Sequence, residues 1–314
     1  MAVSLAIAVI LLFHLDFERL LEHFAIISRP VLGVIILSLI PALLVRGYRW
    51  KLLFDNRTNS IRLTDSMALL LVGAALNLVL PASTGDIAKS YFGYRWSGVK
   101  ERMLSVSLID KVIALGAISV LGVPCALYRG ELLYAGLSIL VLLPAFVLLG
   151  LPVLIKHVPF CRKLFNGATK VVRKKLDFLK VVEQVNPSKK KVAEALLLSV
   201  TGWLITYLQM YLCFRAVDVK IPLVYVFSVA PLLTLVRLFP FTLSGIGTDE
   251  AAMWYFFSHA GAGLEGILAG AFAYRFVILI LPGMVGLLVL ARTKRLGSSK
   301  KGLSSSGPLP FYDK

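Results

Sequence analysis

Charged residues are scarce in this chain, and acidic residues are the scarcest of them. Only 16% of the 314 residues are charged, whereas a soluble domain has about 25%. Hydrophobic residues make up 58% of the chain, and its mean hydropathy is +0.82. This composition excludes an ordinary soluble enzyme and a disordered chain, and it predicts an integral membrane protein.

Catalytic and cofactor-binding motifs are also lacking. The three cysteines have no metal-ligand spacing, the four histidines are scattered, and no HExxH, GxSxG or P-loop motif occurs. The longest polar stretch, residues 156–191, is too short for a catalytic domain. We therefore expect no cofactor, no metal, no nucleic-acid partner and no catalytic residues, so the protein is not expected to be an enzyme.

The basic residues predict which segments face the cytoplasm. Lys and Arg outnumber Asp and Glu by 34 to 17, and membrane proteins concentrate Lys and Arg in cytoplasmic loops. We expect a multi-pass protein of the plasma (inner) membrane with a cytoplasmic C-terminus. The expected cytoplasmic segments are 46–62, which includes Arg46 and Arg49, then 89–102, 156–191 and the tail after Ala291.

Apolar runs of about 20 residues predict membrane spans. Full spans are expected at 1–15, 30–46, 103–127, 132–155, 192–214 and 267–292. The first is short, and a cleaved signal peptide is its alternative. In segment 156–191, apolar residues recur at helical spacing among basic ones. This pattern predicts an amphipathic helix on the anionic cytoplasmic leaflet, with a solvated topology anchor as the alternative.

Two further apolar regions, 64–94 and 222–258, are interrupted at their centres. Each contains a proline followed by hydroxyl residues, glycine and an acidic residue. The predicted topology requires each region to begin and end on the same side of the membrane. We therefore expect two re-entrant hairpins, with Pro81 and Pro240 as structural breaks and Asn77 bonding the carbonyls freed by Pro81. Ordinary full spans in a different topology are the alternative.

The predicted fold is an all-α polytopic membrane protein with six full spans and two hairpins. Residues 1–292 form a single transmembrane domain of two repeats, about 1–127 and 132–292. Each repeat has the order span, span, hairpin, span, and its odd number of full spans inverts the second repeat relative to the first. Inverted repeats with broken helices are typical of transporters. The tail, residues 293–314, is rich in Ser, Gly and Pro and is expected to be disordered and cytoplasmic.

The two hairpin tips predict a binding site for an anion. A helix that begins at membrane depth points its free N–H groups and its positive dipole end into the protein. Two such ends would frame one site for a phosphate or carboxylate group, although the hydroxyl residues would also serve as plain N-caps. The expected substrate-binding residues are Ser83, Thr84, Gly85, Asp86, Arg237, Ser244, Gly245, Gly247, Thr248 and Arg275.

Eight charged residues, four of each sign, are expected at membrane depth. An unpaired charge at a helix centre costs about 2.5–3.5 kcal/mol on insertion scales, so this balance predicts ion pairs. Asp86 and Lys89 are expected to pair along one helix. Arg237 and Arg275 are expected to pair with the Asp249–Glu250 dipeptide. Such pairs either stabilise packing alone, or the arginines bind a head group while carboxylates carry protons or cations. The expected coupling or ion-pair residues are Asp86, Lys89, Asp110, Asp249 and Glu250.

Four motifs carry a resemblance to a known family. They are RGYRWKLL at 46–53, NLVLPASTGD at 77–86, Glu101–Arg102 with Asp110, and the stretch from Pro240 to Ala252 followed by Arg275. They resemble the flippase-like transmembrane domain of the lysylphosphatidylglycerol synthase family over about residues 5–292. Ser244–Gly245 replaces the family's usual double glycine. The cytosolic aminoacyl-transferase domain of full-length synthases is absent from the sequence, so the resemblance implies a stand-alone lipid translocation module.

These observations predict a flippase-like or transporter-like protein. It is expected to move an anionic or phosphate-bearing lipid, a phospholipid or a polyprenyl-phosphate-linked lipid, between the leaflets. The expected partners are membrane lipids with anionic head groups. Because no nucleotide motif occurs, transport is expected either to be coupled to a proton or cation gradient or to be facilitated without a driving gradient. One alternative is a non-transporting membrane partner of a lipid-modifying or glycosyl-transferring enzyme. Another is an intramembrane lipid-phosphate enzyme.

Overall fold

The described part of the chain consists of helices and turns, and no strand occurs in it. The computed structural model describes residues 16–56, 58–80, 84–97, 100–140, 142, 187–238 and 247–299. Four helical stretches are long and apolar enough to cross a membrane: Arg29–Phe54, Arg102–Tyr128, Lys189–Ala216 and Leu264–Arg292. The prediction of an all-α membrane protein is therefore confirmed. The predicted span 1–15, most of the span 132–155 and residues 156–186 of the basic segment lie outside the described residues.

The described helices before residue 141 cover the predicted first repeat from residue 17 onward and the start of the second repeat. They are α2 (Phe17–Ala25), α3 (Arg29–Leu37), α4 (Leu39–Phe54), α5 (Leu63–Asn77), α6 (Gly85–Ser97), α7 (Lys100–Tyr128) and α8 (Leu132–Leu140). Helices α3 and α4 form one stretch that runs well past the predicted end of the span at residue 46. Arg46 and Arg49 therefore lie inside a helix, which corrects their placement after it. The physical reason is that no proline or turn sequence interrupts residues 42–54.

The second half begins with a long helix and ends with another. Its helices are α12 (Lys189–Ala216), α13 (Leu223–Leu238), α14 (Thr248–Ser258), α15 (Leu264–Arg275), the π-helical turn η3 (Phe276–Ile280) and α16 (Leu281–Ser299). Because α15, η3 and α16 follow one another without a break, they form one bent rod. Residues 293–299 are helical, which corrects the prediction of a disordered tail from 293; a helix already under way extends without paying the nucleation cost again. Residues 300–314 lie outside the described part.

Helices α5 and α6 form an antiparallel pair. Their contacts run in opposite directions along the two helices, since Gly85 lies against Asn77 and Gly73, while Lys89 lies against Gly73 and Gly93 lies against Leu69. Helix α5 has 15 residues and is therefore about 22 Å long, shorter than a hydrocarbon core of about 30 Å. Helix α6 is shorter still, with 13 residues, so neither crosses a bilayer alone.

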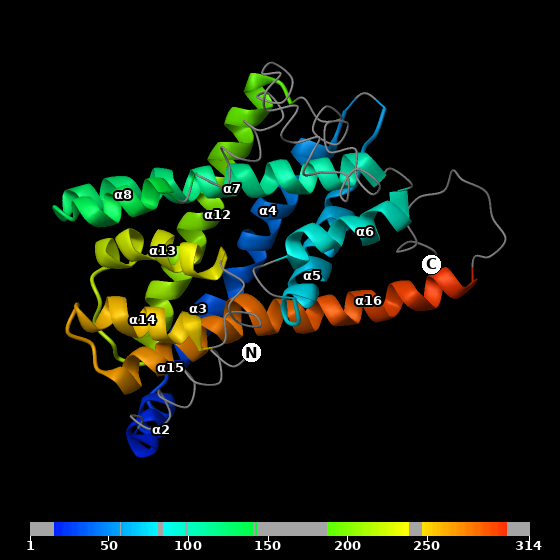
Figure 1. The fold of residues 1–314 in the computed structure, drawn as a ribbon. Coiled ribbons are helices and arrows are strands. Elements are labelled where there is room, and N and C mark those ends of the chain that lie inside the picture. The colour runs from blue at the N-terminus through cyan, green and yellow to red at the C-terminus, as the bar shows by residue number, and fades with distance from the viewer. Residues whose placement is uncertain are drawn as a thin grey trace, which may run out of the picture.

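The long helices form a frame around this pair. Helix α7 lies on one side of the molecule and the α15–α16 rod on the other, while α4 and α12 cross between them (Figure 1). Helix α16 packs along α5, and α13 packs against α7 and α14. The two larger hydrophobic cores are separate, one around Phe214, Phe257 and Tyr274 and the other around Trp50 and Phe54, and each includes residues from both halves of the chain.

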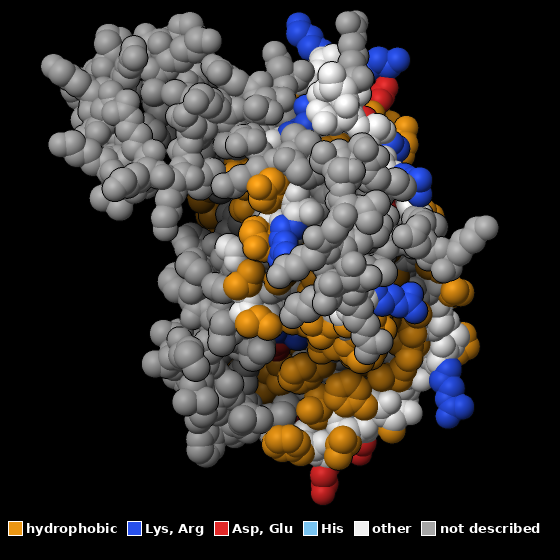
Figure 2. Space-filling model, turned by 90° about the vertical axis from the view of Figure 1, so that its right-hand side faces the viewer, with side chains coloured by type: hydrophobic (Ala, Val, Ile, Leu, Met, Phe, Trp, Pro, Cys, Tyr) orange, Lys and Arg blue, Asp and Glu red, His pale blue; other side chains and the backbone are white. Residues whose placement is uncertain are grey.

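The outer surface is rich in hydrophobic side chains. Leu37, Leu197 and Leu288 are each 66–68% exposed, and hydrophobic side chains form a broad patch on the face shown in Figure 2. Exposed large hydrophobic residues on this scale mark a surface that contacts something other than water. On a chain with four membrane-crossing stretches, that surface is the one that contacts lipid.

Candidate functional site

A cavity of about 560 Å³ lies between the helices at the centre of the molecule. Its volume is in the range of small-molecule sites. Helices α3 to α7, α12, α13 and the η3–α16 segment all contribute side chains to its wall. The polar part of the lining consists of Arg46, Arg49, Asn77, Asp86, Lys89, Ser107, Asp110, Lys111, Trp203, Gln209, Thr234 and Arg237.

One buried ion pair ties the first half of this wall together. The Arg49 Nε atom on α4 lies 2.6 Å from Asp110 Oδ1 on α7, and both side chains are less than 10% exposed. Arg49 also donates from Nη1 to Ser199 Oγ on α12, at 2.7 Å. Three helices that are distant in sequence are therefore joined through one guanidinium group.

A second ion pair differs from the one predicted. Lys111 Nζ on α7 lies 2.9 Å from Asp86 Oδ2 on α6, and Asn77 donates to the other oxygen of Asp86 at 3.2 Å. The salt bridge of Asp86 is therefore with Lys111 and not with Lys89, although Lys89 lies near enough for its charge to attract Asp86. The aliphatic part of the Lys89 side chain instead packs against α5 at Gly73. A Cβ atom added to Gly73 would lie only 3.2 Å from Lys89 Cδ. Both residues line the cavity, but the carboxylate of Asp86 bonds to Lys111 from the neighbouring helix α7.

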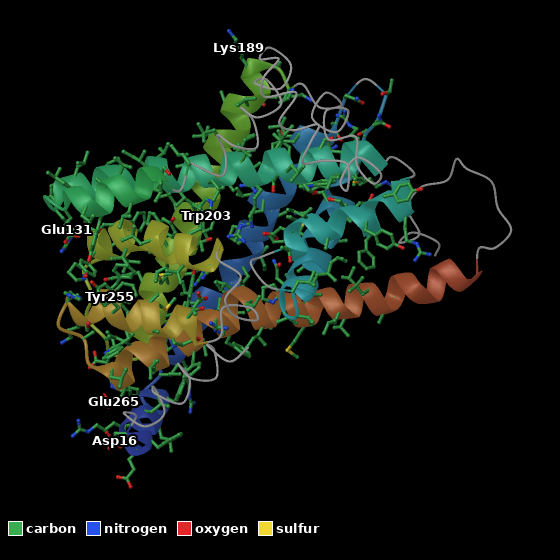
Figure 3. The ribbon with its side chains drawn as sticks, in the orientation of Figure 1. Asp16, Glu131, Lys189, Trp203, Tyr255 and Glu265 are labelled. Carbon is green, nitrogen blue, oxygen red and sulfur yellow. The ribbon has the colours of Figure 1, made fainter. Side chains whose placement is uncertain are left out.

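Lys89 and Arg46 form no ion pair within 4.0 Å among the described residues, although Asp86 and Asp110 attract both cations at longer range. The Lys89 side chain is buried, with the residue only 2% exposed, and it makes no hydrogen bond or ion pair within that part of the chain. Arg46 donates to Thr206 Oγ1 at 2.7 Å and lies 5.8 Å from the centre of the Trp203 ring. Figure 3 labels Trp203, close to the crossing of α12 and α7. Both cations line the cavity.

The ion pairs predicted for the second half are confirmed. Arg237 Nε lies 2.8 Å from Asp249 Oδ2, and Arg275 Nη2 lies 2.8 Å from Glu250 Oε1 and 3.4 Å from Asp249 Oδ2. The two carboxylates occupy the first turn of α14, where the helix dipole favours negative charge. Arg237 also lines the cavity, so this cluster reaches the site through one guanidinium group.

The two helix starts at the predicted hairpin tips have different local structures. At the start of α6, a Cβ atom on Gly85 would lie 2.6 Å from the Gly73 carbonyl oxygen, so only glycine fits. Before α14, Gly247 has a φ of 85°, a conformation that favours glycine. The Gly247 N–H donates to Glu250 Oε2 at 2.8 Å. The sequence analysis expected Gly247 to bind an anionic substrate. In the structure its N–H already bonds to Glu250 as part of a helix cap.

The structure brings together only part of the predicted residue set. Asp86, Lys89, Asp110 and Arg237 line the cavity. Thr84 and Thr248 lie at the starts of α6 and α14 and, like Gly85, Gly247 and Arg275, are not among its lining residues. The remaining predicted residues lie outside the described part of the chain: Pro81, Ser83, Pro240, Ser244 and Gly245.

Sequence reasoning missed several residues of the cavity wall. Arg46, Arg49 and Lys111 line it, as do Trp203 and Gln209. The available signal was the spacing of Arg46 and Arg49, which are three residues apart and directly follow an apolar run, so that a continuing helix places them on one face.

One side of the cavity wall is apolar and faces outward. Leu37 and Ile40, from the α3–α4 stretch, are 66% and 58% exposed and also line the cavity. Leu281, Pro282 and Val285 of α16 contribute apolar surface to the same wall. The site therefore joins a charged interior to an apolar surface at the outside of the helix bundle, which suits an amphipathic ligand.

Comparison with known proteins gives one match. The sequence pattern of the family described as the lysylphosphatidylglycerol synthase TM region matches residues 1–286. That range includes all the polar residues of the cavity wall. No curated protein matches the chain.

Proposed function

We propose that this protein moves a lipid between the two leaflets of the membrane. The chain belongs to the family of the lysylphosphatidylglycerol synthase TM region, which is a membrane domain related to lipid handling. The lipid carries an anionic or phosphate-bearing head group, which enters the central cavity. The observation that carries this proposal is the excess of positive charge in a cavity formed by membrane-crossing helices.

The charge in the cavity favours an anionic ligand. Five cations line it, whereas the only carboxylates in its described wall are Asp86 and Asp110. A charge without a partner at membrane depth costs about 2.5–3.5 kcal/mol on insertion scales. An entering phosphate or carboxylate offsets that cost, and Arg46 offers the planar fork that matches such groups. The excess of cations in the cavity wall therefore favours binding of an anion.

The apolar side of the cavity favours a lipid over a soluble anion. Leu37 and Ile40 are exposed on the outer surface and also line the cavity. A lipid bound here would place its head group among the arginines and lysines while its chains stay beside α3–α4 and α16. The acyl chains would then remain in the hydrocarbon region throughout, so only the head group has to be rehydrated or paired.

We propose that the two short helix pairs are re-entrant hairpins in two inverted repeats. Helices α5 and α6 are each too short to cross the bilayer, and α13 and α14, with 16 and 11 residues, form the corresponding pair in the second half. The basic run Lys189–Lys191 at the start of α12 lies at the end of the molecule opposite Asp16 and Glu265 (Figure 3). This supports a plasma-membrane orientation with the Lys189 end in the cytoplasm.

The proposed mechanism is alternating exposure of the cavity without covalent change of the lipid. Each carboxylate of the cavity and of the α14 start is held by a Lys or Arg side chain: Asp86 by Lys111, Asp110 by Arg49, and Asp249 and Glu250 by Arg275. Asp86 is the most accessible of them, with 38% of its side chain exposed. It is therefore our candidate for proton or cation coupling.

A lipid-flipping assay tests this function. Purified protein is reconstituted into liposomes containing fluorescent phosphatidylglycerol or phosphatidate, and dithionite then reduces the fluorophore in the outer leaflet. Wild-type protein should expose inner-leaflet lipid to the reductant, and Lys111→Met should slow this exchange. The matched control is Lys190→Met, because the Lys190 side chain is 87% exposed on α12.

Two outcomes would refute the proposal. One is a dithionite trace for wild-type liposomes that equals the protein-free trace with both lipids. The other is the appearance of a new lipid species in mass spectra of the same liposomes, because this would show covalent turnover rather than transport.

A further inference from the structure

We infer that Lys89 and Arg46 form a subsite for a phosphate group with two negative charges, so that the preferred lipid is a phosphomonoester or diphosphate lipid rather than a phosphodiester. This inference rests on the proposed function and narrows its substrate class. It is based on which charged side chains of the cavity wall form ion pairs with one another and which do not.

Three of the five cations in the wall already have a carboxylate. Arg49 is paired with Asp110 at 2.6 Å, and Lys111 is paired with Asp86 at 2.9 Å. Arg237 is held by the α14 carboxylate at 2.8 Å. These three cations are neutralised by their carboxylate partners, so a ligand gains little from them without first breaking a buried pair.

The other two cations are left for the ligand. Lys89 makes no hydrogen bond or ion pair to any residue that the structure describes, although only 2% of the residue is exposed. Arg46 uses one N–H to bond Thr206 and has four of its five N–H donors left. Its guanidinium lies over the Trp203 ring, 5.8 Å from the ring centre, and Arg46 is one of the residues that line the cavity.

The charge count then selects among lipid phosphates. The five cations of the described wall face three carboxylates, Asp86, Asp110 and the Asp249 partner of Arg237, so two positive charges are in excess. Lys89 and Arg46 are the two cations that form no ion pair among the described residues. A phosphomonoester carries about 1.5–2 negative charges at pH 7, whereas a phosphodiester carries one. A phosphomonoester therefore nearly neutralises the excess charge and a diphosphate fully offsets it, whereas a phosphodiester leaves one positive charge in excess. A zwitterionic lipid would add a further cation.

Lipid competition measured by native mass spectrometry tests this inference. Protein in detergent is offered equal amounts of phosphatidate, a phosphomonoester, and phosphatidylglycerol, a phosphodiester. We expect wild type to retain phosphatidate about tenfold or more over phosphatidylglycerol, because charge-assisted bonds to the second negative charge are strong. Lys89→Met should abolish this preference while phosphatidylglycerol is still retained, because the variant cavity carries a single unpaired cation. Lys190→Met, on the exposed start of α12, should behave as wild type.

A charge-retaining variant separates charge from packing. Arg46→Lys should keep the preference for phosphatidate, and Arg46→Met should lose it. A wild type that retains the two lipids equally would overturn the inference, as would a Lys89→Met protein that loses both lipids to the same extent. Inorganic phosphate added at the concentration of phosphatidate should not displace it, and displacement would overturn the lipid assignment in favour of free phosphate.

Different results would refute the proposed transport function and the proposed phosphate subsite. Loss of dithionite-detected exchange with an intact phosphatidate preference would refute transport alone. Exchange of phosphatidylglycerol as fast as phosphatidate, with no preference in mass spectra, would refute the charge-matched subsite and leave the transport function standing.

Discussion

Asp110→Asn should isolate a buried arginine and strongly destabilise the protein. The Asp110 carboxylate lies 2.6 Å from Arg49, and neither side chain is more than a tenth exposed. The pair joins α4 to α7, and Arg49 extends the link to Ser199 on α12. After the substitution, the guanidinium keeps the hydroxyl of Ser199 as a neutral partner, but no carboxylate within 4.0 Å remains in the described part of the chain.

We expect Asp110→Asn to lower the free energy of unfolding by several kcal/mol. Removal of one partner of a buried ion pair costs about 3–5 kcal/mol, and we expect the lower end because asparagine keeps one acceptor oxygen for Arg49. The excess positive charge of the cavity also rises by one. The matched control is Glu194→Gln, which removes an exposed pair with Lys190 at 4.0 Å. Such surface pairs contribute about 0–1 kcal/mol.

Denaturant unfolding in detergent, followed by tryptophan fluorescence, measures the difference. A double variant, Arg49→Met with Asp110→Leu, sharpens the test, because apolar replacement of both partners is often neutral or stabilising. The double variant should therefore unfold later than Asp110→Asn. The reasoning is refuted if Asp110→Asn lies within about 1 kcal/mol of wild type, or if the double variant is less stable than the single one.

Three further substitutions have expected outcomes. Lys89→Met should raise the thermal unfolding temperature of lipid-free protein in scanning fluorimetry, since it removes a buried charge with no partner among the described residues; an unchanged or lower temperature would contradict this. Gly85→Ala should lower the free energy of unfolding by about 1–3 kcal/mol, because the new Cβ atom would lie 2.6 Å from the Gly73 carbonyl oxygen. The control Gly136→Ala places its Cβ atom in open space and should leave the thermal unfolding temperature nearly unchanged in scanning fluorimetry. Gly247→Ala should cost about 1–2 kcal/mol in denaturant unfolding, because φ is 85° there; wild-type stability would show that the turn relaxes.

Local patterns in the sequence predicted much of the helical architecture. The apolar runs predicted the spans that become α7, α12 and the α15–α16 rod, because a helix in lipid must satisfy its own backbone and so follows hydropathy closely. The ion pairs of Arg237 and Arg275 with the α14 carboxylates were also predictable. They required only that opposite charges at similar membrane depth find each other.

The cavity was less predictable because its wall comes from seven helical segments. Asp86 and Lys89 are three residues apart on α6, so local spacing favoured their pairing. The pairing that forms depends on how α6 is rotated against α5 and α7, since Lys111 of α7 reaches Asp86 while Lys89 passes over Gly73. Helix rotation is decided by side-chain packing between segments, which a single sequence does not display.

The sequence by itself determined that this protein is an α-helical membrane protein of a lipid-handling family, with buried charges of both signs. Hydropathy and charge balance depend only on composition and order along the chain, so they are visible without coordinates. Tertiary structure alone decided which charges remain unpaired. Lys89 and Arg46 are the uncompensated cations of the described cavity wall because the nearby carboxylates were closer to Lys111 and Arg49, and that choice depends on distances between helices.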